Sequence, residues 1–146
     1  MALAKTWQPS TGAKSQVRVR LVDPETEEII TEGTADYVAM VDGIVEIIDW
    51  KAGPRQRYYL DAPDENLQVL AYGLAAALER DARAFRVGIG FTSEEDPSIR
   101  WSQVYEHGAW GEIWDRIARA CSMPAEAVVG PHCGNCFQRK HCPAWL

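Results

Sequence analysis

Two carboxylates and an ammonium, those of Asp36, Asp49 and Lys51, interrupt the otherwise apolar stretch TADYVAMVDGIVEIIDWKAG. The dipeptide Asp42-Gly43 lies midway between the two aspartates and predicts a two-residue turn joining two antiparallel strands. Counting outward from that turn places Asp36 directly opposite Asp49, with Cβ atoms ~5 Å apart, where like charges repel each other. We therefore expect a positive group to lie between or beside the two carboxylates.

Lys51 is expected on the same face as Asp49, because side chains two residues apart on a strand point the same way. A magnesium or manganese ion would relieve the repulsion and use both carboxylates as hard oxygen ligands. The lysine could then orient an attacking water or stabilise charge on a phosphate oxygen. The alternative is an exposed sheet end at which the lysine merely offsets the charge of the aspartates. The same face carries an apolar surface made of Val38, Met40, Val45 and Ile47.

The composition predicts one globular domain, residues 1–146. Of the 146 residues 47% are hydrophobic and 25% charged, which is typical of globular proteins. The net charge of −6 counts against a broad attraction to nucleic acid, although a local site can still be basic. No signal peptide or membrane helix is recognisable, so a cytoplasmic location and no membrane partner are expected. In a reducing compartment the four cysteines are more readily metal ligands than disulfides.

The order of predicted elements indicates an α/β (α+β) fold with a central mixed sheet and flanking helices. The first helix should be capped by Asp61 or Asp64 and bury a stripe of Leu67, Leu70, Ala71, Leu74 and Leu78. Residues 28–41 are expected to form one strand or two, with a break near Gly33. The predicted strands are residues 16–22, 28–41, 44–51, 84–92 and 98–106, and the predicted helices are residues 64–82 and 109–122.

Three motifs along the chain resemble those of RecB-like nucleases in the PD-(D/E)XK superfamily. They are Gly33-Thr-Ala-Asp36, Ile48-Asp49-Trp50-Lys51 and Gln68-Val-Leu-Ala-Tyr72, which are similar to G-x-x-D, D-x-K and Q-x-x-x-Y. The tail with Cys133, Cys136 and Cys142 resembles the C-terminal segment of the iron–sulfur branch, which includes the AddB nuclease domain and the CRISPR adaptation exonucleases. The resemblance implies a restriction-endonuclease-like core with a cysteine-rich, metal-bound tail.

The resemblance also implies a role for each motif residue. Asp36 and Asp49 would bind Mg²⁺ or Mn²⁺ with the Trp50 carbonyl as a further ligand, and Lys51 would be the catalytic lysine. The residues Gln68 and Tyr72 would line the active site or contact DNA. The implied activity is metal-dependent hydrolysis of DNA, by an exonuclease acting on single strands or DNA ends in recombination, repair or phage DNA processing.

This chain departs from the family pattern before Asp36. RecB-like nucleases usually carry a His on an earlier helix, and the iron–sulfur members place a first Cys near the N-terminus, whereas this chain has neither there. Either the fold is reduced, or the chain is a portion of a longer one. Glu32 is a candidate substitute ligand, and Glu46 is a poorer one because alternation puts it on the face opposite Asp49. A homo-oligomer or a larger recombination complex could also supply the ligand.

Residues 121–146 form the cysteine-rich tail. Four thiolates, those of Cys121, Cys133, Cys136 and Cys142, could hold either zinc or a [4Fe-4S] cluster, and the spacing does not choose between them. His132 and His141 offer a mixed zinc site instead. In each case we expect the metal to be structural, because the tail has too little apolar surface to fold alone.

Basic and aromatic residues follow Lys51 directly in KAGPRQRYY. Arg55 and Arg57 could contact phosphates, while Tyr58 could stack on an unpaired base, so we expect them to bind DNA. Residues 138–141, QRKH, form a second basic patch. An ordinary solvated loop explains either patch equally well. Two rival functions follow from the whole sequence: a DNA- or protein-binding module that has lost catalysis, and a zinc scaffold unrelated to nucleases.

Overall fold

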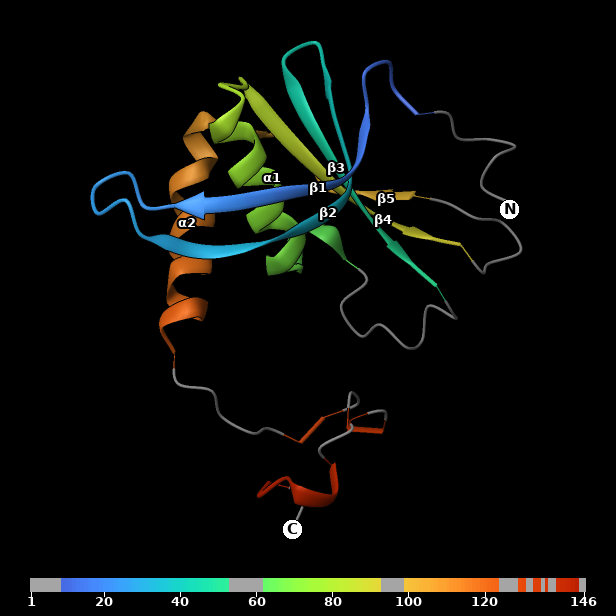
Figure 1. Cartoon of the computed structure of the whole chain (residues 1–146), viewed down its shortest axis with the longest axis vertical. Coiled ribbons are helices and arrows are strands. Elements are labelled where there is room, and N and C mark those ends of the chain that lie inside the picture. Colours follow the sequence, from blue (N-terminus) through green and yellow to red (C-terminus); the bar gives the residue numbers. More distant parts are fainter. Residues whose placement is uncertain are drawn as a thin grey trace.

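The computed structural model describes residues 9–52, 62–92, 99–123, 129–130, 133–134, 136 and 139–144. Its elements form a mixed sheet with two helices (Figure 1). Their bounds are β1 Lys14–Val22, β2 Ile29–Val41, β3 Ile44–Lys51, η3 Pro63–Glu65, α1 Leu67–Glu79, β4 Ala84–Phe91, β5 Ile99–Trp101, β6 Tyr105–Glu106, α2 His107–Ser122 and η5 Arg139–His141. None of the helices described is long and apolar enough to cross a membrane.

The sheet has the strand order β1-β2-β3-β4-β5, with β6 pairing to β4. Strands β1, β2 and β3 form an antiparallel meander, β3 and β4 are parallel, and β5 and β6 are antiparallel to β4. Helix α1 is the crossover between the two parallel strands, as parallel pairing requires. The predicted mixed sheet with flanking helices is therefore confirmed.

The hairpin between β2 and β3 has the predicted register. Asp42 and Gly43 both have positive φ, 51° and 76°, as a two-residue turn of the favoured hairpin type requires. The ladder runs from Val41–Ile44 to Tyr37–Ile48 without a shift. The ladder ends there, one step before Asp36 and Asp49, so the structure confirms the predicted register as far as Tyr37 and Ile48.

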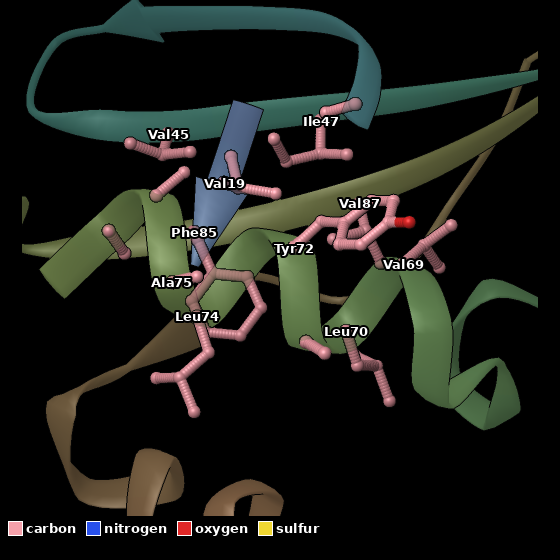
Figure 2. Close-up of a cluster of buried hydrophobic side chains, with 14 of the residues drawn as sticks. Val19, Val45, Ile47, Val69, Leu70, Tyr72, Leu74, Ala75, Phe85 and Val87 are labelled. Carbon is pink, nitrogen blue, oxygen red and sulfur yellow. The ribbon is translucent and has the colours of Figure 1, made fainter. Parts of the chain in front are cut away.

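Helix α1 lies across one face of the sheet and buries the main core (Figure 2). Val45, Ile47 and Phe85 point from the strands toward α1, and Leu74 lies on the side of α1 away from the sheet. The predicted apolar face is confirmed for Val38, Val45 and Ile47, which are buried. The prediction is wrong for Met40, which is 41% exposed. Of the predicted helix stripe, Leu78 is wrong, because it is 49% exposed.

The first helix begins later than the sequence predicts. Its N-cap is Asn66, whose side chain accepts hydrogen bonds from the backbone N–H groups of Gln68 and Val69. Asp64 is not the cap, because its carboxylate accepts hydrogen bonds from the Gln103 backbone and the Tyr105 hydroxyl instead. The other predicted cap, Asp61, lies outside the described residues.

Two strand predictions also need correction. The single strand predicted for residues 98–106 is two short strands, because Ser102 turns inward and its hydroxyl accepts a hydrogen bond from the Val87 N–H. The break predicted near Gly33 does not occur, since β2 is continuous through it. A Cβ at Gly33 would lie 2.1 Å from the Tyr72 hydroxyl oxygen, so the missing side chain makes room for Tyr72.

Candidate active site

The candidate site lies where β3 ends at the carboxyl edge of the parallel pair β3–β4, the edge at which open α/β sheets usually bind ligands. Lys51 ends β3, and its carbonyl accepts hydrogen bonds from the Thr92 N–H (3.0 Å) and hydroxyl (3.3 Å). Asp49 is two residues earlier on the same strand. The backbone that carries both charged groups is therefore fixed by the neighbouring strand.

Asp36 reaches this edge from β2 through an irregularity in the strand. Ala35 and Val38 both belong to the cluster buried beneath α1 although they are three positions apart, so the two-residue alternation slips at Asp36. On the neighbouring strand β1, Gln16 has a φ of 53°, and the pair Gln16–Asp36 is missing from the regular register. Because of this slip, the Asp36 side chain does not follow the regular alternation of side chains along β2.

Two hydrogen bonds hold the Asp36 carboxylate. The Gln16 side-chain amide donates to Oδ1 at 3.0 Å, and the Trp50 backbone N–H donates to Oδ2 at 2.9 Å. The second bond crosses from β2 to β3 where the ladder between them stops. Each carboxylate oxygen keeps a lone pair after accepting one bond, so Asp36 is oriented but can still bind a cation.

Asp49 carries the unusual atom of the site. Its Oδ2 is buried and accepts no hydrogen bond from the described residues. The Lys51 Nζ lies 2.6 Å from it, and the side chains of Lys51 and Asp49 are 24% and 14% exposed. A buried anionic oxygen normally gathers several donors because desolvation of a charge is costly. An oxygen with one ionic contact and spare lone pairs fits a metal ligand.

The predicted pair Gln68 and Tyr72 forms a hydrogen bond across one turn of α1, with the Gln68 amide donating to the Tyr72 hydroxyl at 3.1 Å. Tyr72 is 9% exposed and belongs to the buried cluster drawn in Figure 2. Its hydroxyl rests against Gly33 of β2. Gly33 is three residues before Asp36. The contact explains physically why a glycine in the first motif accompanies a tyrosine in the third.

The structure does not bring a further acidic ligand to the two aspartates. Glu32, the candidate substitute, is ion-paired with Arg18 at 2.6 Å and with Arg20 at 3.2 Å across β1. Glu46 lies on the opposite face, as predicted, where it binds Arg86. Within the part of the chain that the structure describes, no three His, Cys, Asp or Glu residues gather as metal ligands. The substitute role for Glu32 is therefore wrong in this structure.

The structure joins none of the four cysteines, all of them among the described residues, in a disulfide. Cys133 is buried, and its Sγ accepts a hydrogen bond from the Gly130 N–H at 3.3 Å, whereas Cys121 and Cys136 are exposed. These three and Cys142 do not form a cluster of ligands among the described residues. The metal-bound tail therefore stays a prediction. His132 and the predicted DNA contacts Arg55, Arg57 and Tyr58 lie outside the described residues, as does part of the patch at residues 138–141.

Sequence reasoning missed two residues of the site. Gln16 orients Asp36, and Thr92 fixes the carbonyl of Lys51. Gln16 begins a regular alternating stretch, and nothing in that pattern marks its positive φ. Thr92 could have been suspected, because it directly follows the strand that pairs with β3.

Comparison with known proteins agrees with this geometry. Residues 3–143 match the family model described as PD-(D/E)XK nuclease superfamily. No curated protein matches the chain. Among solved structures it is similar to the crystal structure of SSO0001, with a TM-score of 0.53 and 17% sequence identity over 92% of this chain and 61% of SSO0001. At that identity the likeness shows a shared fold, and this chain spans less than two thirds of SSO0001.

Proposed function

The chain belongs to the PD-(D/E)XK nuclease superfamily, and we propose that it is a divalent-metal-dependent deoxyribonuclease with its active site at Asp36, Asp49 and Lys51. The observation that carries the proposal is the buried Oδ2 of Asp49, which accepts no hydrogen bond from the described residues and lies 2.6 Å from the Lys51 ammonium. Two carboxylates are enough for Mg²⁺ or Mn²⁺ here, because such ions keep several waters and also bind substrate phosphate.

Asp36 and Asp49 would hold the ion, with the Trp50 carbonyl as a further oxygen ligand. When bound, the ion would supply Lewis-acid activation of the phosphate and of the attacking water. Lys51 would stabilise the charge that develops on a phosphate oxygen, since its ammonium is partly buried and already held beside Asp49. Gln16 keeps Asp36 in place during the reaction through its hydrogen bond to Oδ1.

The proposed substrate is single-stranded DNA or a DNA end, which an exonuclease would digest in recombination, repair or phage DNA processing. Family likeness supports this choice. Gln68 and Tyr72 would contact the DNA beside the scissile phosphate, since Tyr72 abuts Gly33 three residues from Asp36. Arg55, Arg57 and Tyr58 would contact the strand further along. We also propose that the tail cysteines bind zinc or an iron–sulfur cluster, because Cys133 and Cys136 belong to one short turn.

A cleavage assay on end-labelled single- and double-stranded DNA tests the proposal. The wild-type protein should cleave in Mn²⁺ or Mg²⁺ and not in EDTA, and Lys51→Ala should reduce the rate at least about a hundredfold. Lys14→Ala is a matched control, because Lys14 is an exposed lysine to which no role in catalysis, metal binding or DNA binding is assigned. Equal cleavage by wild type and Lys51→Ala would refute the assignment of the active site.

A second candidate, a DNA-binding module without catalysis, is favoured by one observation. The described residues bring no third acidic or His ligand to Asp36 and Asp49. This function predicts DNA binding without cleavage in any metal, and it predicts that Asp49→Asn strengthens binding by removing a negative charge near the phosphates.

A further inference from the structure

An apolar groove lies on the side of the molecule where the β1–β2 turn approaches both helices. It has a volume of about 540 Å³ and is lined by α1, α2 and the turn. Leu74 and Leu78 of α1 and Trp110 and Trp114 of α2 form its walls. A second hollow of about 330 Å³ shares Val22 and Leu78 with it, so the two form one continuous depression. We name the whole depression the α1–α2 groove.

The walls of the groove are apolar and already in place. Leu78 is 49% exposed and Val22 is 39% exposed, which is unusual for adjacent large aliphatic side chains. Trp110 is fixed by a hydrogen bond from its Nε1 to the Tyr105 carbonyl at 2.9 Å and by an edge contact with His107. Trp114 lies one helical turn later on the same face.

Gly111 lines the groove from the interior of α2. A Cβ at Gly111 would meet no atom within 4 Å, so the packing of the described residues does not require a glycine there. A glycine within a helix costs stability relative to alanine. The open space at Gly111 leaves room for an occupant to lie against α2.

One rim of the groove is strongly acidic. The turn between β1 and β2 reads DPETEE and carries four carboxylates and no basic residue. Its backbone is held by hydrogen bonds from the N–H groups of Glu25 and Thr26 to the Asp23 carboxylate, at 2.8 and 3.2 Å. Asp23 and Glu25 line the larger hollow, whose described lining contains no cation. The second hollow, by contrast, is lined by Glu79 and by Arg20, which is ion-paired with Glu32.

The negative charge of the β1–β2 turn distinguishes among the candidate occupants of the groove. DNA is disfavoured, because its phosphates would meet the acidic turn. A second copy is disfavoured, because a symmetric contact would bring two acidic turns together. The N-terminal segment is disfavoured, because the Ser10 N–H bonds the Tyr37 hydroxyl, and Tyr37 lies in the cluster on the other face of the sheet.

We propose that the α1–α2 groove binds an amphipathic helix of a partner protein, with apolar side chains on the groove floor and Lys or Arg side chains against the acidic turn. An apolar groove with charged margins is a common receptor for such helices. The groove lies toward the C-terminal end of α1, whereas Gln68 of the candidate active site lies at its beginning. The inference therefore does not depend on the nuclease assignment, and a partner could bind while DNA is cleaved.

The test uses two labelled synthetic helices, one of leucine and lysine and one of leucine and glutamate with the same leucine pattern. Fluorescence anisotropy should show binding of the leucine–lysine helix about tenfold or more tighter at low salt, and this preference should shrink at high salt. Equal affinity for the two helices would overturn the proposal.

Two variants make the test specific. Gly111→Leu should fill the groove and abolish binding while the helix still forms, whereas Gly108→Leu, with equally open space but outside the groove lining, should bind as the wild type does. Glu25→Lys/Glu28→Lys should reverse the preference toward the leucine–glutamate helix. Unchanged binding by Gly111→Leu would overturn the proposal. A dimer that Gly111→Leu dissociates, without helix binding by the wild type, would overturn it in favour of a second copy.

Discussion

Strand β3 carries a largely buried carboxylate on each face, Glu46 on one and Asp49 on the other. The two carboxylates are paired with their cations in different ways. Glu46 is 8% exposed and has donors for both oxygens: Arg86 binds Oε1 through Nε at 2.9 Å and through Nη2, and Ser10 reaches Oε2 at 3.5 Å. The Arg86 guanidinium also lies 4.2 Å from the centre of the Trp101 ring. Asp49 has Lys51 and a buried oxygen that accepts no hydrogen bond from the described residues.

The difference separates a structural ion pair from a site built for a ligand. The guanidinium of Arg86 is a planar donor that gives two hydrogen bonds to one oxygen of Glu46, so together with Ser10 it provides a donor for each oxygen. The ammonium of Lys51 is a point charge that leaves lone pairs of Asp49 available. Asp36 also lies beside this part of β3, because its carboxylate accepts a hydrogen bond from the Trp50 N–H, whereas the ladder partner of Glu46 is the uncharged Ala39.

The largest expected effect is on cleavage, from Asp49→Asn. Asparagine keeps the size of the side chain and removes the charge that the metal needs, so the cleavage rate should fall at least about a hundredfold. Asp49 Oδ2 accepts no hydrogen bond from the described residues, so the substitution loses only the ionic contact with Lys51, and thermal stability should fall less than in Glu46→Gln. Parallel rate and melting measurements check this. A stability loss as large as that of Glu46→Gln would remove the contrast between the two pairs.

Glu46→Gln should lower the stability of the protein and leave the cleavage rate unchanged. It leaves the Arg86 guanidinium without its anion, at a side chain that is 36% exposed, so we expect a loss of about 1–3 kcal/mol in the free energy of unfolding. The cleavage rate per folded molecule should stay the same. Urea unfolding and cleavage at saturating Mn²⁺ measure the two quantities, and a fall in the rate of the folded protein would assign Glu46 to the site.

A third carboxylate, that of Asp64, is held by hydrogen bonds within the fold, as that of Glu46 is. Its Oδ1 accepts hydrogen bonds from the Tyr105 hydroxyl and from the Gln103 N–H. Burial, and then the hydrogen bond to Asp64, raise the pKa of Tyr105 to about 12. The folded protein keeps this proton to higher pH than the unfolded chain does. The contribution of the protonated Tyr105 hydroxyl to folding stability is therefore complete below pH ~10 and is lost as pH rises toward 12.

Tyr105→Phe should therefore cost about 1 kcal/mol at neutral pH and should weaken the fall in stability above pH 10. Denaturant unfolding at pH 8 and pH 11 checks both effects. Tyr37→Phe is a control of the same chemical type, since the Tyr37 hydroxyl accepts a hydrogen bond from Ser10. An identical pH profile for wild type and Tyr105→Phe would contradict the assignment.

The smallest effect is expected from Tyr72→Phe. The substitution removes the hydroxyl that accepts from Gln68 and leaves the ring in the core, so cleavage should fall about two- to tenfold and stability by less than about 1 kcal/mol. Initial rates over a range of DNA concentrations would separate binding from turnover. No change in either would show that the pair Gln68–Tyr72 is structural, like Glu46–Arg86.

The arrangement of the carboxylates on β2 and β3 could be predicted in part from the sequence, because it depends on local chemistry. The two-residue turn at Asp42-Gly43 fixes the register of β2 and β3 as far as the pair Tyr37–Ile48, and Asp36 then reaches β3 through the Trp50 N–H, next to Asp49. Alternation then separates Glu46 from Asp49. The family match over residues 3–143 agrees with the motifs that suggested the superfamily.

The remaining features depend on distant partners that no local pattern shows. Asp64 looked like a helix cap, but its carboxylate is used by residues 39 and 41 positions away. Gly33 looked like a strand break, but it accommodates Tyr72 from α1. Leu78 continued the apolar stripe, yet it lies in the α1–α2 groove, and apolar periodicity does not distinguish a core from a docking surface.

Manganese binding measured by isothermal titration calorimetry tests the central claim most directly, because it needs no DNA. The wild-type protein and Glu46→Gln should bind Mn²⁺ at the Asp36–Asp49 site, and Asp36→Asn and Asp49→Asn should lose that binding. Asparagine at position 36 keeps one acceptor oxygen, so it retains one of the hydrogen bonds from Gln16 and Trp50 while it removes the charge. Equal Mn²⁺ binding by the wild type and Asp49→Asn, or no binding by folded wild type, would contradict the claim that β2 and β3 form a metal-dependent active site.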